Sequence, residues 1–121
     1  MDTTGPARII TGYSATQLRV GEQVVATSAI VTAQLVLPWA VATFADLTAT
    51  ALDPALALDI EVLLLATGEQ QLWPGAAVFA HAARRRIGLE VMTLSAACRT
   101  FNVLVGDRRP VALAALLGTA G

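Results

Sequence analysis

The fold is decided by the stretch Val91–Arg109, VMTLSAACRTFNVLVGDRR, which has the pattern of a strand end, a turn and one amphipathic helix. We expect the helix over Ser95–Val105, with the Ser95 side chain as its N-cap. Ser95, Arg99 and Asn102 are spaced at i, i+4 and i+7, so they share one face of this helix. The stretch therefore predicts a packed helix that carries a polar face.

Around this stretch the chain alternates between strand and helix patterns. A strand buried on both faces is expected over Ile60–Ala66, a helix over Ala76–Arg86, and short strands over Leu89–Met92 and Val111–Leu117. The order from Ile60 is β-α-β-α-β, which favours a sheet with parallel strands and right-handed crossovers.

The first third of the chain is rich in residues that favour strands. Four strands are expected there, with a hairpin turn at Gly21-Glu22: Arg8–Tyr13, Gln17–Val20, Gln23–Thr27 and Ile30–Leu37. A short helix is expected over Ala45–Ala51. The 121 residues fit one domain, so we expect a flexible tail over residues 1–7 and a single α/β domain over residues 8–121.

Composition excludes several classes of protein. The chain is 55% hydrophobic and 14% charged, which is far from the signature of disorder. Its net charge is −1, with arginine as the only strongly basic residue, so it shows no electrostatic footprint for nucleic acid. The one cysteine, Cys98, excludes an internal disulfide and indicates a reducing compartment. With neither a signal peptide nor an apolar run of the roughly 20 residues that a spanning helix needs, we expect a soluble cytoplasmic protein without membrane insertion.

Two turns are expected to meet at one edge of the sheet. Thr67 and Gly68 follow the strand that ends at Ala66, and the turn Met92–Ser95 follows the next strand. Ligands of open α/β sheets bind beyond the carboxyl ends of the strands. The candidate ligand-binding residues at this crevice are Thr67, Gly68, Ser95, Cys98, Arg99 and Asn102. The alternative is that the polar helix face only satisfies hydrogen bonds within the domain.

Two further polar groups have a functional and a structural interpretation. Cys98 would be a nucleophile if the helix dipole favoured its thiolate, but a small buried apolar cysteine is the competing interpretation. On the helix over 76–86, the core face is expected to hold Phe79, Ala82 and Ala83, and the outer face Ala77, His81, Arg84 and Arg85. His81 with Arg84–Arg86 is then either a solvated face or a patch for phosphate or an acidic partner.

The remaining chemistry-bearing residues form no reaction centre in the sequence. Trp39 and Trp73 each adjoin a proline, and either could anchor a partner or pack over a loop. No glycine-rich phosphate loop, metal-ligand cluster or acid/base pair is present in the sequence pattern. We therefore expect no catalytic residues, no metal and no cofactor.

Several of these motifs together resemble a known family. The stretches that carry the resemblance are Ile60–Gly68, Val91-Met92, the run Ala96–Asn102 (AACRTFN), and Arg108-Arg109 before the last strand. They resemble a widespread family of small domains of unknown function, which includes bacterial and archaeal hypothetical proteins, an adipogenesis-associated animal protein and the third assembly factor of mitochondrial respiratory complex I. The chain departs from the family pattern at Ala66, Thr93-Leu94 and Phe101, where the family usually has glycine, an acidic residue followed by threonine, and tyrosine.

The resemblance implies an α/β, three-layer fold with a central mixed β-sheet, two main helices and an additional β-rich N-terminal layer. It implies no established catalytic residue or cofactor. Two functions follow as hypotheses. One is a non-enzymatic interaction or assembly factor with a protein partner, linked to complex I by the resemblance. The other is a small-ligand or enzyme domain that uses the crevice at Thr67-Gly68 and Met92–Arg99. Either function is compatible with a homodimer.

Overall fold

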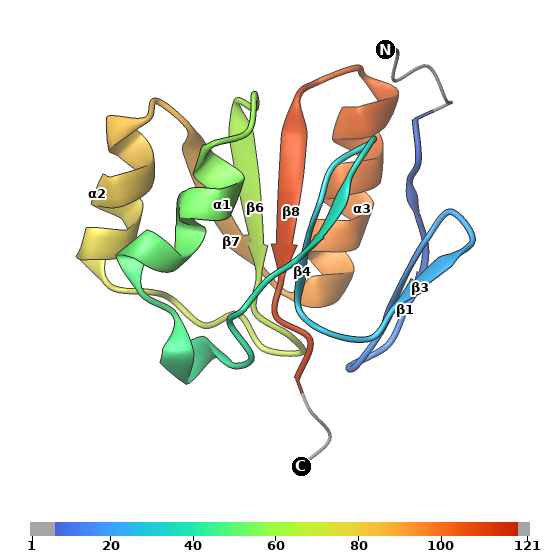
Figure 1. The fold of residues 1–121 in the computed structure, drawn as a ribbon, viewed down its shortest axis with the longest axis horizontal. Helices are drawn as coiled ribbons and strands as arrows, with labels where there is room; N and C mark the ends of the chain where they lie inside the picture. Colours follow the sequence, from blue (N-terminus) through green and yellow to red (C-terminus); the bar gives the residue numbers. More distant parts are fainter. Residues whose placement is uncertain (1–6, 119–121) are drawn as a thin grey trace.

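A mixed five-stranded sheet forms the centre of the molecule, which the computed structural model describes over residues 7–118. Across the sheet the strand order is β5 (Val36–Pro38), β4 (Ala29–Val31), β8 (Val111–Ala115), β6 (Val62–Ala66) and β7 (Gly88–Met92). Strand β6 pairs in parallel with both β7 and β8, whereas β4 runs antiparallel to β5 and β8 (Figure 1). The parallel β-α-β-α-β unit predicted from the sequence is therefore confirmed.

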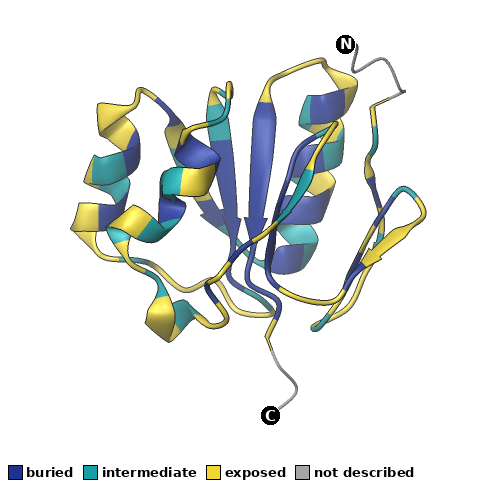
Figure 2. Cartoon of the chain, in the orientation of Figure 1, coloured by how far each residue is buried: buried dark blue, intermediate teal, exposed yellow. Residues whose placement is uncertain are grey.

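Strand β6 explains why the sheet is covered on both sides. Its side chains alternate between two hydrophobic clusters, with Leu63 and Leu65 in one and Leu64 and Ala66 in the other. The helices α1 (Asp53–Leu56) and α2 (Ala76–Arg84) cover the first face, and α3 (Leu94–Gly106) covers the second (Figures 1 and 2). An apolar strand of this kind is stable only between two layers.

A second, smaller sheet lies on the outer side of α3. It consists of β1 (Ile10–Tyr13), β2 (Leu18–Val20) and β3 (Gln23–Val25) in antiparallel order, with Gly21 at a φ of 60° in the turn between β2 and β3. Its buried residues pack in the same cluster as Phe101 of α3. This sheet is the predicted β-rich N-terminal layer, so the three-layer fold is confirmed.

Two local predictions in the first half of the chain are wrong. The single strand expected over Ile30–Leu37 is a hairpin, because the Thr32 hydroxyl accepts hydrogen bonds from the N–H groups of Gln34 and Leu35 and closes a turn. The helix expected over Ala45–Ala51 is two 3₁₀ turns, η1 (Phe44–Asp46) and η2 (Ala49–Leu52), of which η2 leads into α1. The tail predicted over residues 1–7 lies outside the described residues, except for Ala7.

Helix α2 is rotated relative to the predicted orientation. Val78 and Ala82 are its buried residues, Phe79 is half-buried, and Ala83, expected in the core, is exposed. His81, expected on the outer face, is half-buried against α1. The reason is that η2 and α1 pack beside α2 and cover a flank that the sequence pattern treats as solvated. Within residues 7–118, no helix combines the length and apolarity that crossing a bilayer requires.

Candidate functional site

A pocket of about 670 Å³ opens at the carboxyl ends of β6 and β7. The turn after β6 contributes Thr67 and Gly68, and the start of α3 contributes Ser95. The two turns are joined directly, because Leu94 N donates to Gly68 O at 2.7 Å. The structure thus brings three of the six predicted ligand-binding residues together at the predicted edge. Cys98, Arg99 and Asn102 lie outside the lining of this pocket.

Thr67 and Gly68 shape the pocket through the backbone. The buried Thr67 hydroxyl donates to Gln70 O at 2.6 Å and accepts from Leu72 N at 3.0 Å, so it holds the loop that follows β6. Gly68 has a φ of 98°, a conformation that other residues rarely adopt, and a Cβ there would meet no atom within 4 Å. Conformation, and not space, requires glycine at this turn.

The N-cap of α3 differs from the prediction. Thr93, not Ser95, is the N-cap, and its Oγ1 accepts a hydrogen bond from Ala96 N at 3.3 Å. The helix begins one residue earlier than expected because the bond from Leu94 to Gly68 fixes the first turn. The half-buried Ser95 side chain is therefore not used for capping and faces the pocket.

Asn102 and Arg99 differ sharply although they share a helix face. The Asn102 side chain accepts from Ile10 N at 2.8 Å and donates to Ile10 O at 2.9 Å, so it ties β1 to α3. The Arg99 side chain is exposed, and no hydrogen bond or ion pair is formed by it with residues 7–118. Asn102 thus satisfies hydrogen bonds within the domain, as the structural interpretation of this helix face predicts. Arg99 faces solvent.

Cys98 is a buried apolar residue in chemical terms. Burial raises the pKa of its thiol from 9.0 to about 11, although the nearby Arg99 guanidinium opposes this. Cys98 lies past the first turn of α3, in a buried apolar cluster, so burial has a larger effect on its pKa than the helix dipole. The thiol is therefore buried and protonated at neutral pH, which favours the interpretation of Cys98 as a small apolar core residue.

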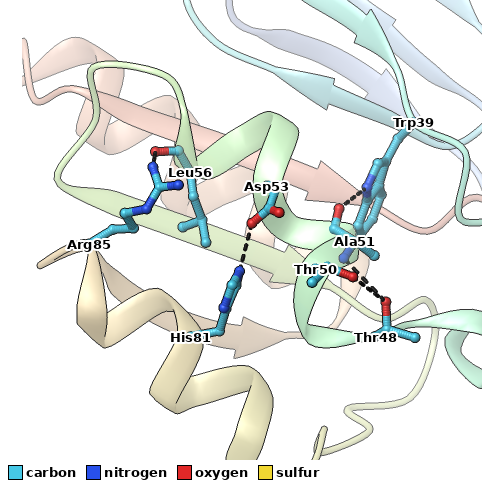
Figure 3. Close-up of polar contacts among 8 residues, drawn as sticks. All are labelled: Trp39, Thr48, Thr50, Ala51, Asp53, Leu56, His81 and Arg85. Carbon is cyan, nitrogen blue, oxygen red and sulfur yellow. Dashed lines mark hydrogen bonds and ion pairs between the residues drawn. The ribbon is translucent and has the colours of Figure 1, made fainter.

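His81 is also engaged within the fold. Its Nε2 lies 2.6 Å from Asp53 Oδ1 on α1, and the side chains are 21% and 48% exposed (Figure 3). Arg85, the C-cap residue of α2, donates to Leu56 O at 3.5 Å. These contacts join α2 to α1 on the face of the sheet opposite to Cys98. The geometry therefore contains no cysteine–histidine pair.

The two tryptophans have opposite environments. Trp39 is 6% exposed, and its Nε1 donates to Ala51 O at 2.8 Å, so it packs over η2 (Figure 3). Trp73 is 64% exposed and stacks on Phe79 with ring centroids 6.3 Å apart. Trp73 is therefore the tryptophan that can contact a partner.

One wall of the pocket comes from the first 44 residues and is not predicted from the sequence. Its lining includes Tyr13 and Ser14 from the end of β1 and beyond it, and Thr43 and Phe44 from η1 and its flank. These residues are more than 20 positions from Thr67, and only the packing of the layers brings them there. Among the described residues no group of histidine, cysteine and acidic side chains could hold a metal ion.

Two known proteins are similar to this chain in sequence. It is 32% identical over 111 residues to the Drosophila melanogaster protein named NADH dehydrogenase [ubiquinone] 1 alpha subcomplex assembly factor 3, covering 88% of this chain and 57% of that one. It is 37% identical over 60 residues to the 13 kDa major membrane protein of Francisella tularensis, covering 50% of this chain and 49% of that one. The chain thus spans about half the length of these curated relatives.

This chain is also similar to a solved structure, and a family model matches most of its length. The NMR structure of the Xanthomonas campestris protein XCC1710 has a TM-score of 0.86 and 34% sequence identity, and the match covers 100% of this chain and 92% of that one. The family model described as "Protein of unknown function (DUF498/DUF598)" matches residues 10–116. This confirms the resemblance that the AACRTFN run indicates. The chain belongs to the DUF498/DUF598 family.

Proposed function

We propose that this chain is a non-enzymatic assembly factor that binds a protein partner through the surface around Trp73. The observation that carries the proposal is the exposure of Trp73, at 64%, beside the exposed Leu72. Tryptophan is enriched among residues that dominate binding energy at protein interfaces. A large indole left in solvent is therefore better explained by a partner than by packing.

The Trp73 side chain is held in place before any partner arrives. Its ring stacks on Phe79 of α2, and Pro74 restricts the backbone that follows it. The preceding residue, Leu72, is fixed by the hydrogen bond from its N–H to the Thr67 hydroxyl. A preorganised anchor loses little conformational entropy on binding, which supports a docking role.

The kind of assembly is inferred from the Drosophila relative. Its name describes an assembly factor of NADH dehydrogenase, and it aligns with 88% of this chain. We extend that role to this chain as assembly of respiratory complex I, carried out from the cytoplasm. The name of the Francisella relative supports a place of action close to a membrane.

The interaction role is tested by quantitative cross-linking and capture of the tagged chain in native cells. The parent chain is compared with Trp73→Ala and with the matched control Val103→Ala, which changes an equally exposed apolar residue on α3. We expect complex I subunits to be enriched with the parent and with Val103→Ala, and reduced at least tenfold with Trp73→Ala. Equal recovery of complex I subunits with all three chains would show that Trp73 does not contribute to partner binding.

The pocket at Thr67, Gly68 and Ser95 favours a second candidate function, binding of a small ligand. It lies where ligands bind in open α/β sheets, and its lining combines hydroxyl groups with apolar side chains. A metabolite screen by thermal shift tests it, with Ser95→Leu to fill the pocket and Arg99→Ala as the matched control outside it. A ligand at 100 times its dissociation constant adds about 2.7 kcal/mol to stability. The candidate requires that Ser95→Leu abolish the shift and Arg99→Ala preserve it.

A further inference from the structure

Strand β7 is one of the two edge strands of the central sheet, and two contacts show in which direction its backbone groups point. Gly88 N donates to Glu61 O at 2.9 Å, and Met92 O accepts from Thr67 N at 3.0 Å, so both residues face β6. Residues alternate in direction along a strand, and the N–H and C=O of one residue point to the same side. Leu89 and Val91 therefore point their backbone groups away from the sheet.

One of these outward groups is already covered by a side chain. Gln71 Nε2 donates to Val91 O at 2.8 Å, so a side-chain amide stands where the backbone N–H of an added strand would stand. Within residues 7–118, no other side chain donates to or accepts from the outward groups of Leu89 and Val91. An edge of this kind is a template for an extended segment of another chain.

The negative charge of Glu90, at the middle of β7, determines which kind of strand can pair with this edge. Glu90 lies between the two outward residues and is exposed. If two copies paired Leu89 of each with Val91 of the other, the two Glu90 side chains would stand directly opposite each other. Like charges in that position destabilise a strand pair, and opposite charges stabilise it. The edge therefore disfavours a second copy and favours a strand with a cation opposite Glu90.

We propose that β7 accepts an extended segment of a partner protein as an additional strand, with a lysine or arginine of that segment opposite Glu90. The Gln71 amide is displaced when the segment binds. This inference rests on the proposed interaction function and deepens it, because the loop that carries Gln71 also carries the exposed Trp73. The segment supplies backbone pairing at the edge, and Trp73 supplies the apolar anchor.

Two synthetic peptides test the strand addition on the full chain. Each has seven residues with blocked ends and alternating valine and threonine, around a central lysine in one and a central glutamate in the other. We expect the lysine peptide to bind about fivefold more tightly, the factor that about 1 kcal/mol of cross-strand charge pairing gives. At saturation it slows hydrogen exchange of the Leu89 amide at least tenfold, and the Glu90 amide, which faces β6, is the internal reference.

Two variants sharpen the test. Glu90→Lys reverses the preference to the glutamate peptide, whereas Glu22→Lys, the same charge change in the turn of the small sheet, leaves the preference as in the parent. Gln71→Ala tightens binding of the lysine peptide by about two- to tenfold, because no side chain competes for Val91 O. All three positions are exposed, so the variants are expected to fold.

Several results would overturn the strand addition. They are equal affinity for the two peptides, an unchanged Leu89 amide at saturation, or the same change of preference from Glu22→Lys as from Glu90→Lys. A dimer of the parent chain with a protected Leu89 amide would also overturn it, because a second copy would then cover the edge. If neither peptide binds but Trp73→Ala still reduces the capture of complex I subunits, the strand addition is wrong and the proposed interaction function is unaffected. Peptide binding without any captured subunit would count against the interaction function alone.

Discussion

Asn102 and Arg99 show how far single residues can be interpreted from spacing. Their helical periodicity correctly places them on one side of α3, but it does not say what that side meets. The small sheet covers Asn102, whose amide bonds both backbone groups of Ile10, and it leaves Arg99 in solvent. Ile10 is 92 positions away from Asn102, so no local pattern could have indicated the contact.

Removing the Asn102 amide should destabilise the fold. In Asn102→Ala, the N–H and C=O of the buried Ile10 lose their partner, and we expect a loss of about 2–3 kcal/mol in the free energy of unfolding. Thr100→Ala on the same helix is the matched control and should change stability by less than about 0.5 kcal/mol. Urea unfolding measures both. A loss below about 1 kcal/mol for Asn102→Ala would contradict the structural role.

Cys98 should give stability a pH dependence in the alkaline range. Its pKa is about 11 in the folded chain and about 9.0 ordinarily, so the unfolded chain loses this proton first as the pH rises. The folded state then binds more protons, and stability falls between about pH 9 and pH 11, by up to about 2–3 kcal/mol. Below pH 9 the contribution is fully present.

The matched comparison for this prediction is Cys98→Ala. The difference in unfolding free energy between the parent and Cys98→Ala, measured by urea unfolding from pH 7 to pH 11, should shrink as the pH rises. A difference that stays constant over this range would show that the thiol ionises in the same way in both states.

At the scale of elements, α2 and α3 end in the same way. In each, the N–H groups of two residues past the helix bond back to carbonyls of the last turn: Arg86 to Ala83 and Ile87 to Ala82, and likewise Arg108 to Val105 and Arg109 to Leu104. This is the Schellman motif, whose left-handed position is usually glycine. Here arginine occupies it, with φ of 59° at Arg86 and 60° at Arg108.

Glycine at these positions should stabilise the protein. A residue with a side chain loses about 1–2 kcal/mol of stability in the left-handed conformation, and glycine avoids this loss. The greater freedom of glycine in the unfolded chain lowers the free energy of unfolding by about 0.5–1 kcal/mol, so the net gain is smaller. We expect Arg86→Gly and Arg108→Gly each to raise the unfolding free energy by up to about 1 kcal/mol. Arg84→Gly, in the right-handed last turn of α2, is the control and should lower it by about 1 kcal/mol. Equal losses at Arg84 and Arg86 would refute this explanation.

Elements with a clear hydrophobic periodicity are predicted well from the sequence. Elements whose ends depend on a single side-chain or backbone hydrogen bond are not. The apolar run of β6 and the periodicity of α3 require a strand buried on both faces and an amphipathic helix, and both are present. The hairpin between β4 and β5 depends on one threonine hydroxyl within an apolar stretch that looks continuous in sequence. The start of α3 similarly depends on a bond from Leu94 to Gly68, which the sequence pattern does not contain.

At the scale of the whole molecule, the layers decide which residues meet. The AACRTFN run identifies the family and with it the three-layer fold, which composition alone does not give. The pocket edge at Thr67, Gly68 and Ser95 follows from strand order, but its opposite wall comes from Tyr13 and Phe44 through the packing of the small sheet and η1. The contrast between Trp39 and Trp73 arises in the same way, because both adjoin a proline and only Trp39 is covered by η2.

The amount of assembled respiratory complex I in native cells tests the central claim most directly. Cells that lack the chain are complemented with the parent, with Trp73→Ala or with Val103→Ala, and intact complex I is quantified on native gels together with the level of each chain. We predict that assembled complex I falls without the chain, returns with the parent and Val103→Ala, and stays low with Trp73→Ala at an equal chain level. Normal complex I in cells without the chain, or full recovery with Trp73→Ala, would contradict the account.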